Sequence, residues 1–142
     1  MYTKQIIKTE SFFNRKKHSI LVVEDDEDNQ LLLKYAIAMF GWQYSSATDA
    51  VSAISFAKEK QPDLILLDIV MPYISGLQIA CLLKNHLKTK NIPLIAVTGL
   101  VEKEQQNIIY AVGFDDYVSK PYALDDLKNA IASILNKKCD YL

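Results

Sequence analysis

The segment LILLD, residues 64–68, runs four apolar residues directly into a carboxylate. Such a segment is typical of a parallel strand that is covered on both faces and carries a polar group at its carboxyl end. Two similar apolar runs, residues 20–23 and 94–97, also lead into polar side chains. Weaker strand candidates at residues 43–47 and 116–118 bring the predicted number of strands to five.

Longer amphipathic stretches separate the predicted strands, and this alternation is the pattern of βα units in a parallel sheet. Gly41 and Gly113 fit the position after a helix, and Asp49 fits the position that caps one. The sequence therefore predicts an α/β fold with a doubly wound sheet of five parallel strands. The expected helices cover residues 29–40, 50–60, 77–87, 102–112 and 124–135.

The composition excludes several classes of protein. With 142 residues, half of them apolar, the chain suits one domain of ordinary size. Its 16 basic and 17 acidic residues leave a net charge of -1, which attracts neither nucleic acid nor an anionic membrane. Cys81 and Cys139 lack the spacing of a metal site or a secreted disulfide framework. No apolar run is long enough for a membrane helix, so we expect a cytoplasmic protein without nucleic-acid or membrane partners.

Polar residues directly follow four of the predicted strands. Glu24 and Asp25 follow the first strand, Asp68 the third, Thr98 the fourth, and Lys120 comes soon after the fifth. In an open parallel sheet, ligands bind outside the carboxyl ends of the strands. If these strands are neighbours, the carboxylates, the hydroxyl and the ammonium meet at one edge of the sheet.

This set of groups suggests phosphoryl chemistry with a bound metal ion. Clustered carboxylates repel one another unless a cation neutralises them, and oxygen ligands suit Mg²⁺, or Mn²⁺ as a substitute, better than zinc. A carboxylate oxygen beside the metal can attack phosphorus and form an acyl phosphate. Asp68 is the expected nucleophile because its strand is the most apolar. Lys120 would offset charge on the phosphoryl oxygens, and the Thr98 hydroxyl would donate a hydrogen bond to one of them.

Each residue also has a simpler interpretation when it is taken alone. The acidic run at residues 24–26 could cap the following helix, because carboxylates stabilise helix N-termini. Asp68 could cap a turn, and Thr98 is an ordinary residue for a strand end. Lys120 alone would be a surface lysine. Only the joint arrangement favours a phosphoryl-transfer site.

Four motifs resemble the receiver domains of bacterial-type response regulators over about residues 19–135. The resemblance implies the flavodoxin-like receiver fold, with strand order 2-1-3-4-5, in a stand-alone regulator similar to those of chemotaxis. We expect an N-terminal extension at residues 1–18, as a tail or an extra helix, the receiver domain at 19–137 and a C-terminal tail at 138–142, with no output domain. The motifs are ILVVEDD (20–26), LILLDIVMPYISG (64–76), LIAVTG (94–99) and DDYVSKPY (115–122).

The resemblance also implies roles for single residues at the acidic site. Asp68 would be the phosphoacceptor and Asp25 a direct metal ligand. Glu24 would reach the metal through water, and Val70 would offer its backbone carbonyl.

Further roles concern the response to phosphorylation. The resemblance implies that Thr98 and Lys120 sense the phosphoryl group and that the peptide bond from Lys120 to Pro121 is cis. Tyr117 falls at the aromatic switch position of the family, where the ring moves as Thr98 shifts. The simpler alternative is that Tyr117 only packs on the edge of the sheet.

The function implied is that of a response regulator phosphorylated by a sensor histidine kinase or a histidine phosphotransfer protein. It would catalyse only its own phosphorylation and dephosphorylation, and it would signal to an unknown downstream protein. The face formed by the fourth helix (residues 102–112), the fifth strand (116–118) and the fifth helix (124–135) would bind that downstream protein or form a homodimer. Val70 and Leu100 are apolar where the family controls access of hydrolytic water, so we expect slow loss of the phosphoryl group.

Two other functions compete with this one. A phosphatase of the haloacid-dehalogenase type also forms an aspartyl phosphate, but it needs a second aspartate two residues after the nucleophile, where this chain has Val70. A receiver-like scaffold that no longer accepts phosphate is the other alternative. It is disfavoured because the expected site residues are all present: Glu24, Asp25, Asp68, Thr98 and Lys120. A dinucleotide-binding site is excluded, since no glycine-rich motif follows the first strand.

Overall fold

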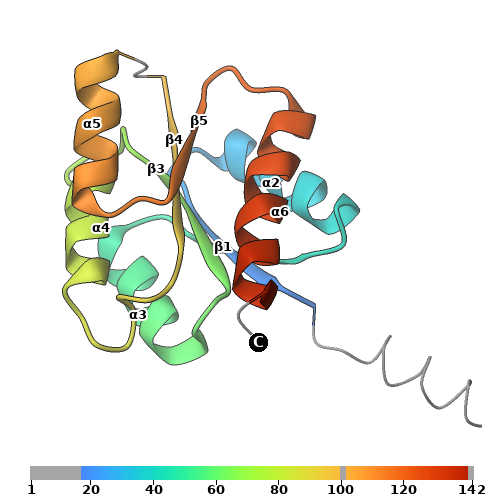
Figure 1. The fold of residues 1–142 in the computed structure, drawn as a ribbon, viewed down its shortest axis with the longest axis horizontal. Coiled ribbons are helices and arrows are strands. Elements are labelled where there is room, and N and C mark those ends of the chain that lie inside the picture. The colour runs from blue at the N-terminus through green and yellow to red at the C-terminus, as the bar shows by residue number, and fades with distance from the viewer. Residues whose placement is uncertain (1–16, 100–101, 141–142) are drawn as a thin grey trace, which may run out of the picture.

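Five parallel strands form one sheet in the computed structural model, which describes residues 17–99 and 102–140. The strand order is β2-β1-β3-β4-β5, which confirms the predicted doubly wound α/β fold (Figure 1). The strands are β1 (Ser19–Val23), β2 (Gln43–Ala47), β3 (Leu64–Asp68), β4 (Leu94–Thr98) and β5 (Asp116–Ser119). The helices are α2 (Glu27–Met39), α3 (Ala50–Lys60), α4 (Gly76–Lys84), α5 (Lys103–Val112) and α6 (Leu124–Asp140).

Helices cover both faces of the sheet, and each face has its own apolar core. Alternate strand residues such as Leu21 and Ile65 pack under α3, α4 and α5, whereas Ile20 and Leu64 pack under α2 and α6. Figure 1 shows these two layers on opposite sides of the strands. All residues of β3 are buried, as expected for a central strand with helices on both faces.

Helix α2 begins two residues earlier than predicted, and helix α4 ends three residues earlier. Helix α2 starts at Glu27 instead of residue 29, because the Asp26 side chain caps it by accepting a hydrogen bond from the Asn29 backbone N–H. Helix α4 ends at Lys84, three residues early. The Thr89 hydroxyl donates to the Leu83 carbonyl over 2.6 Å, so a side chain from the following loop satisfies a carbonyl group of the last helical turn.

The predicted end of the last helix was wrong. Helix α6 continues to Asp140, beyond the expected end at residue 135 and into the expected tail. No glycine or proline occurs between residues 135 and 140 to stop the helix. The N-terminal extension lies outside the described residues up to position 16, and so does Leu100. None of the described helices is long and apolar enough to cross a membrane.

Candidate functional site

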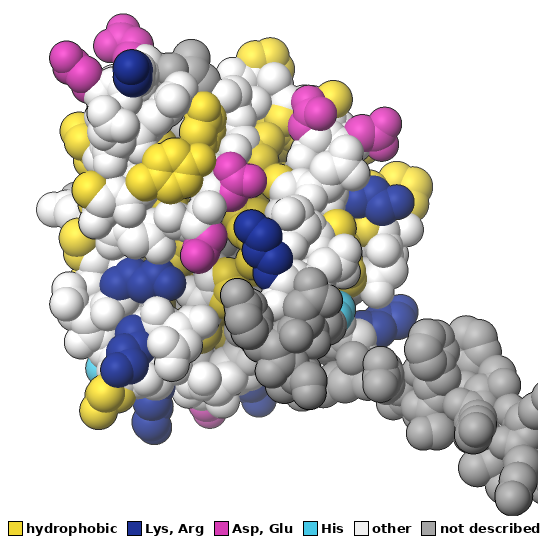
Figure 2. Space-filling model, in the orientation of Figure 1, with side chains coloured by type: hydrophobic (Ala, Val, Ile, Leu, Met, Phe, Trp, Pro, Cys, Tyr) yellow, Lys and Arg dark blue, Asp and Glu magenta, His cyan; other side chains and the backbone are white. Residues whose placement is uncertain are grey.

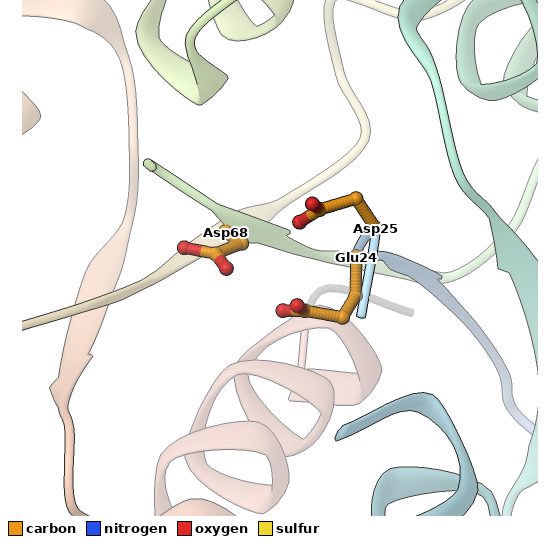
Figure 3. Close-up of side chains that lie close together, drawn as sticks. All are labelled: Glu24, Asp25 and Asp68. Atoms are coloured by element: carbon orange, nitrogen blue, oxygen red, sulfur yellow. The ribbon is translucent and has the colours of Figure 1, made fainter. Parts of the chain in front are cut away.

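Three carboxylates meet at the carboxyl ends of β1 and β3. The two strands are direct neighbours, with Val23 beside Leu67, so the residues that follow leave the sheet side by side. Ligand oxygens of Glu24, Asp25 and Asp68 all lie within 4.8 Å of one another (Figure 3). Glu24 and Asp68 are buried, whereas Asp25 is exposed. The cluster therefore has a buried floor and one carboxylate that faces solvent.

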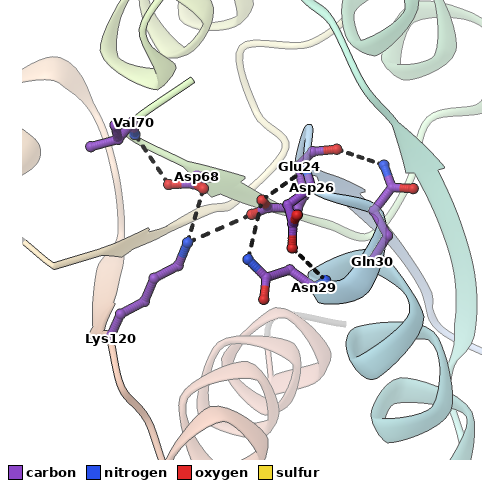
Figure 4. A network of polar contacts seen from close by, with 7 residues as sticks. All are labelled: Glu24, Asp26, Asn29, Gln30, Asp68, Val70 and Lys120. Carbon is purple, nitrogen blue, oxygen red and sulfur yellow. Dashed lines mark hydrogen bonds and ion pairs between the residues drawn. The ribbon is translucent and has the colours of Figure 1, made fainter. Parts of the chain in front are cut away.

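Lys120 extends to this cluster from the end of β5. Its Nζ atom lies 3.0 Å from Asp68 Oδ2 and 3.8 Å from Glu24 Oε2 (Figure 4). The backbone N–H of Lys120 donates to the Thr98 carbonyl over 2.8 Å, and the peptide bond from Lys120 to Pro121 is cis, as the resemblance implies. One ammonium thus neutralises part of the charge of two buried carboxylates.

The electrostatics of the cluster favour an additional positive charge. Burial raises the pKa of Glu24 to about 7, and the hydrogen bond to Asp68 and the Asp68 charge act in the same direction. Burial would lower the pKa of Lys120, but its hydrogen bond to Asp68 and the charges of Asp68 and Glu24 raise it overall. Glu24 is therefore partly protonated near neutral pH, and a bound cation would favour its ionised form.

The acidic run at residues 24–26 has two functions, divided among its members. Asp26 caps α2, whereas Glu24 turns toward Asp68. Glu24 Oε1 accepts from the Asp26 N–H over 3.2 Å and from Asn29 Nδ2 over 3.5 Å, and Gln30 Nε2 donates to the Glu24 carbonyl (Figure 4). The helix-capping interpretation therefore applies to Asp26, and the metal-site interpretation applies to Glu24. The supporting roles of Asn29 and Gln30 were not predicted from the sequence.

A tight loop holds Asp68 from the other side. The Val70 N–H donates to Asp68 Oδ1 over 3.1 Å, and the Gly76 N–H donates to the Ile69 carbonyl over 2.8 Å. A Cβ atom on Gly76 would lie 2.1 Å from the Asp68 carbonyl oxygen, so only glycine fits there. Gly76 was not predicted to support the site, although its place directly after a helix-capping serine was a signal.

The remaining predicted residues lie around the cluster. Thr98 is fully buried at the end of β4, one position beyond the residue that pairs with Asp68. The Tyr117 ring packs edge-on against Tyr110 of α5, with 6.1 Å between ring centroids. This contact agrees with simple packing at the sheet edge, and the switch role of Tyr117 stays a prediction. The carbonyl role of Val70 also stays a prediction.

A cavity of about 410 Å³ opens beside the carboxylates. Glu24, Asp68 and Lys120 line its polar side, and apolar residues such as Leu33 and Val97 line the rest. The cavity therefore leaves unfilled space beside Asp68 on the side of α2.

Residues 20–132 match the family model of the response regulator receiver domain. The chain belongs to this family. Receiver domains are the phosphoryl acceptors of two-component signalling. The three carboxylates of this chain form an acidic cluster typical of the receiver metal site.

Individual relatives agree with this assignment. The receiver domain is 35% identical to the polar-differentiation response regulator DivK of Brucella anthropi over 117 residues, which are 82% of this chain and 95% of that protein. A CheY-like receiver domain protein of Methanospirillum hungatei has the same fold, with a TM-score of 0.80, 24% identity, and coverage of 89% and 100% of the two chains. The receiver domain of a Pseudomonas aeruginosa sensor histidine kinase, solved with magnesium in its active-site cleft, gives a TM-score of 0.78 at 22% identity, covering 84% and 98%.

Proposed function

We propose that Asp68 accepts the phosphoryl group, with Mg²⁺ held by the carboxylates beside it. The observation that carries this proposal is the position of Asp68, a buried carboxylate 3.0 Å from the Lys120 ammonium and within 4.8 Å of the Glu24 and Asp25 oxygens. The donors are all carboxylate oxygens, which suit Mg²⁺ or Mn²⁺ and not zinc. The magnesium in the Pseudomonas aeruginosa receiver domain supports the choice of metal.

The transfer reaction follows from the contacts of Asp68. A carboxylate oxygen of Asp68 attacks phosphorus, and the P–N bond to the donor histidine breaks, leaving the electron pair on the imidazole nitrogen. Lys120 then moves its hydrogen bond from the carboxylate to a phosphoryl oxygen, and Thr98 donates a hydrogen bond to another. Bound Mg²⁺ would offset the negative charge of the phosphoryl oxygens and the carboxylates.

The donor in this proposal is the phosphohistidine of a sensor histidine kinase or a histidine phosphotransfer protein. The protein catalyses only its own phosphorylation and dephosphorylation, and it acts as a signalling module in the cytoplasm. The family assignment supports this, and so does Val70, which stands where a haloacid-dehalogenase phosphatase needs its second aspartate.

The phosphorylated state is recognised at the face of α5, β5 and α6. Figure 2 shows this face, where hydrophobic side chains are exposed among charged ones. Tyr110 of α5 is about half exposed there and contacts the proposed switch residue Tyr117. A downstream protein, or a second copy of this chain, binds this face when Tyr117 changes its rotamer.

Incubation with acetyl phosphate and Mg²⁺, followed by intact-mass measurement, tests the acceptor assignment. The wild-type chain and the control Asp28→Asn, which changes an exposed aspartate of α2, should gain one phosphoryl group. Asp68→Asn should gain none, and EDTA should abolish the reaction in all three. Phosphorylation of Asp68→Asn would show that another residue is the acceptor, and an unchanged wild-type mass with every donor would favour the scaffold alternative.

A further inference from the structure

A groove of about 550 Å³ lies at the end of the domain opposite to Asp68. It runs between the end of α3 and the segment that connects α4 to β4. Its buried lining residues are Pro62 and Ile92, which precede β3 and β4. Asp68 is the last residue of β3, so the groove lies at the amino ends of the strands and is separate from the acidic cluster.

Hydrogen bonds from side chains hold the two walls of this groove in place. The Gln61 side-chain amide donates to the Lys88 carbonyl over 2.8 Å and to the Lys58 carbonyl over 3.0 Å. These bonds tie the end of α3 to the loop before β4. The Lys84 ammonium at the end of α4 donates to the Ile92 carbonyl over 2.9 Å and holds the same loop from the other side. The groove is therefore preformed, and a ligand that fills it does not first have to order the loop.

Lysine side chains surround the groove. Lys58 and Lys88 line its two walls, and Lys60 and Lys90 are exposed two residues further along the same segments. Within residues 17–99 and 102–140, none of these four lysines forms an ion pair. Glu59 is exposed beside them but does not line the groove. Figure 2 shows basic side chains gathered at the lower left, where Figure 1 places the ends of α3 and α4.

Two acidic residues at this end of the sheet have other partners. Asp63 accepts a hydrogen bond from the Ser19 N–H over 2.8 Å and lies 3.7 Å from His18 Nδ1. Asp115 accepts from the Leu94 N–H over 2.9 Å. The groove therefore keeps a local positive charge, although the whole chain has a net charge of -1.

The groove also offers apolar surface to a ligand. Leu87 lines it and is 82% exposed. An exposed leucine beside unpaired ammonium groups favours a ligand that carries both carboxylates and an apolar side chain. A bilayer surface is flat and would contact the rims while leaving the concave part unfilled. An extended stretch of polypeptide fits between α3 and the loop, so the shape favours a protein segment.

We propose that this groove binds an acidic segment of a partner protein. Carboxylates of the segment pair with Lys58 and Lys88, and an apolar side chain packs on Leu87. Surface ion pairs alone are weak, so the apolar contact and the preformed walls supply the rest of the affinity. Pro62 and Asp68 lie roughly 20 Å apart along β3, so the bound segment leaves the phosphoacceptor uncovered. The groove therefore holds the domain beside its partner in both phosphorylation states, and this inference does not depend on the proposed function.

Fluorescence anisotropy with short labelled peptides tests the proposal. The peptides combine glutamate and leucine in different orders, and peptides with lysine in place of glutamate are the ligand control. The double variant Lys58→Gln plus Lys88→Gln removes both pairing groups. The matched control is Lys34→Gln plus Lys137→Gln, which removes the same charge from exposed positions of α2 and α6 on the other face of the sheet.

Glutamate–leucine peptides should bind the wild-type protein, and their affinity should fall as the salt concentration rises. The groove double variant should bind them roughly fivefold more weakly or worse, while the control double variant and Asp68→Asn should bind like the wild type. In nuclear magnetic resonance spectra of the wild-type protein, the backbone amide signals of Lys58, Leu87 and Lys88 should shift on titration with peptide.

Three results would overturn the proposal. The first is that no glutamate–leucine peptide binds the wild-type protein, and the second is equal affinity of the two double variants. The third is binding to vesicles of phosphatidylserine and phosphatidylcholine that the groove double variant loses, without peptide binding, which would make the groove a lipid contact. Labelling of Asp68 by acetyl phosphate is a separate readout, so each of these results leaves the acceptor assignment standing.

Discussion

Lys120 and Asp68 form an ion pair of 3.0 Å between residues that are 52 positions apart in the chain. The same ammonium lies 3.8 Å from Glu24, so one positive charge serves two buried carboxylates. A divalent cation bound at this cluster would be attracted by the same two carboxylates. Lys120 and the metal are therefore competitors in electrostatic terms, although both are needed for the proposed phosphorylated state.

Replacement of Lys120 by glutamine should strengthen Mg²⁺ binding severalfold. The substitution removes the repulsion between the ammonium and the metal, and for a partly exposed pair this is worth about 0.5 to 1 kcal/mol. Isothermal titration with MgCl₂ above pH 8, where Glu24 is ionised, measures the change. Lys128→Gln on α6, where the ammonium stacks over Phe40, is the control. Weaker Mg²⁺ binding by Lys120→Gln would show that the lysine positions the carboxylates instead of competing for them.

The stability of the metal-free protein should fall as the pH rises from about 5 to about 8. Glu24 has a pKa of about 7 in the folded protein and 4.5 as its ordinary value, so between these values the folded state binds more protons than the unfolded state. Stability therefore decreases with rising pH in this window. Below the window, Glu24 is protonated in both the folded and the unfolded state and adds no pH dependence. We expect a loss on the order of 1 to 3 kcal/mol, since one pKa unit corresponds to about 1.4 kcal/mol.

Urea unfolding in EDTA, followed by circular dichroism at pH 5 and pH 8, measures this loss. Glu24→Gln should flatten the pH dependence, because the amide does not titrate, and Mg²⁺ should restore stability to the wild-type protein at pH 8. Glu27→Gln, which changes an exposed carboxylate in the first turn of α2, should keep the slope. A wild-type slope of the opposite sign, or one that Glu24→Gln leaves intact, would mean that Glu24 is already ionised in the metal-free cluster.

Much of the fold and the identity of the acidic residues could be predicted because both depend on local pattern. The apolar run before Asp68 indicates a buried strand without knowledge of its neighbours, and even the weak strand at Gln43–Ala47 has the predicted bounds. Polar residues at the ends of parallel strands must then lie at one edge.

What could not be predicted depends on contacts between distant segments. The end of α4 is set by the Thr89 hydroxyl, which returns from the following loop to the Leu83 carbonyl. The division of labour between Glu24 and Asp26 depends on which side chain points inward, and three acidic residues in succession do not reveal it. The raised pKa of Glu24 comes from burial under α2 and the nearby Asp68, and the positive φ of Tyr73 comes from closure of its loop.

Gly76→Ala should destabilise the protein by about 3 kcal/mol or more and should impair phosphorylation. The new Cβ atom would lie 2.1 Å from the Asp68 carbonyl oxygen and 2.8 Å from Ile69 Cα, and both are backbone atoms that cannot give way without moving the acceptor. Gly99→Ala is the matched control, because a Cβ atom there meets nothing within 4 Å. Urea unfolding and the rate of acetyl phosphate labelling test both variants. Equal stability of the two variants would contradict the assigned role of Gly76.

The double substitution Val70→Asn plus Leu100→Glu should speed loss of the phosphoryl group from Asp68. Val70 is 65% exposed and its apolar side chain cannot orient a water molecule for attack on phosphorus, whereas an amide and a carboxylate can. Leu100 lies outside the described residues, and its part in this prediction rests on the resemblance to the family. The half-life of radiolabelled protein after removal of the donor is the measurement. Val51→Asn, an exposed position on α3, should keep the wild-type half-life. Slower release from the double variant would show that the apolar pair does not protect the acyl phosphate and that the expected long lifetime is wrong.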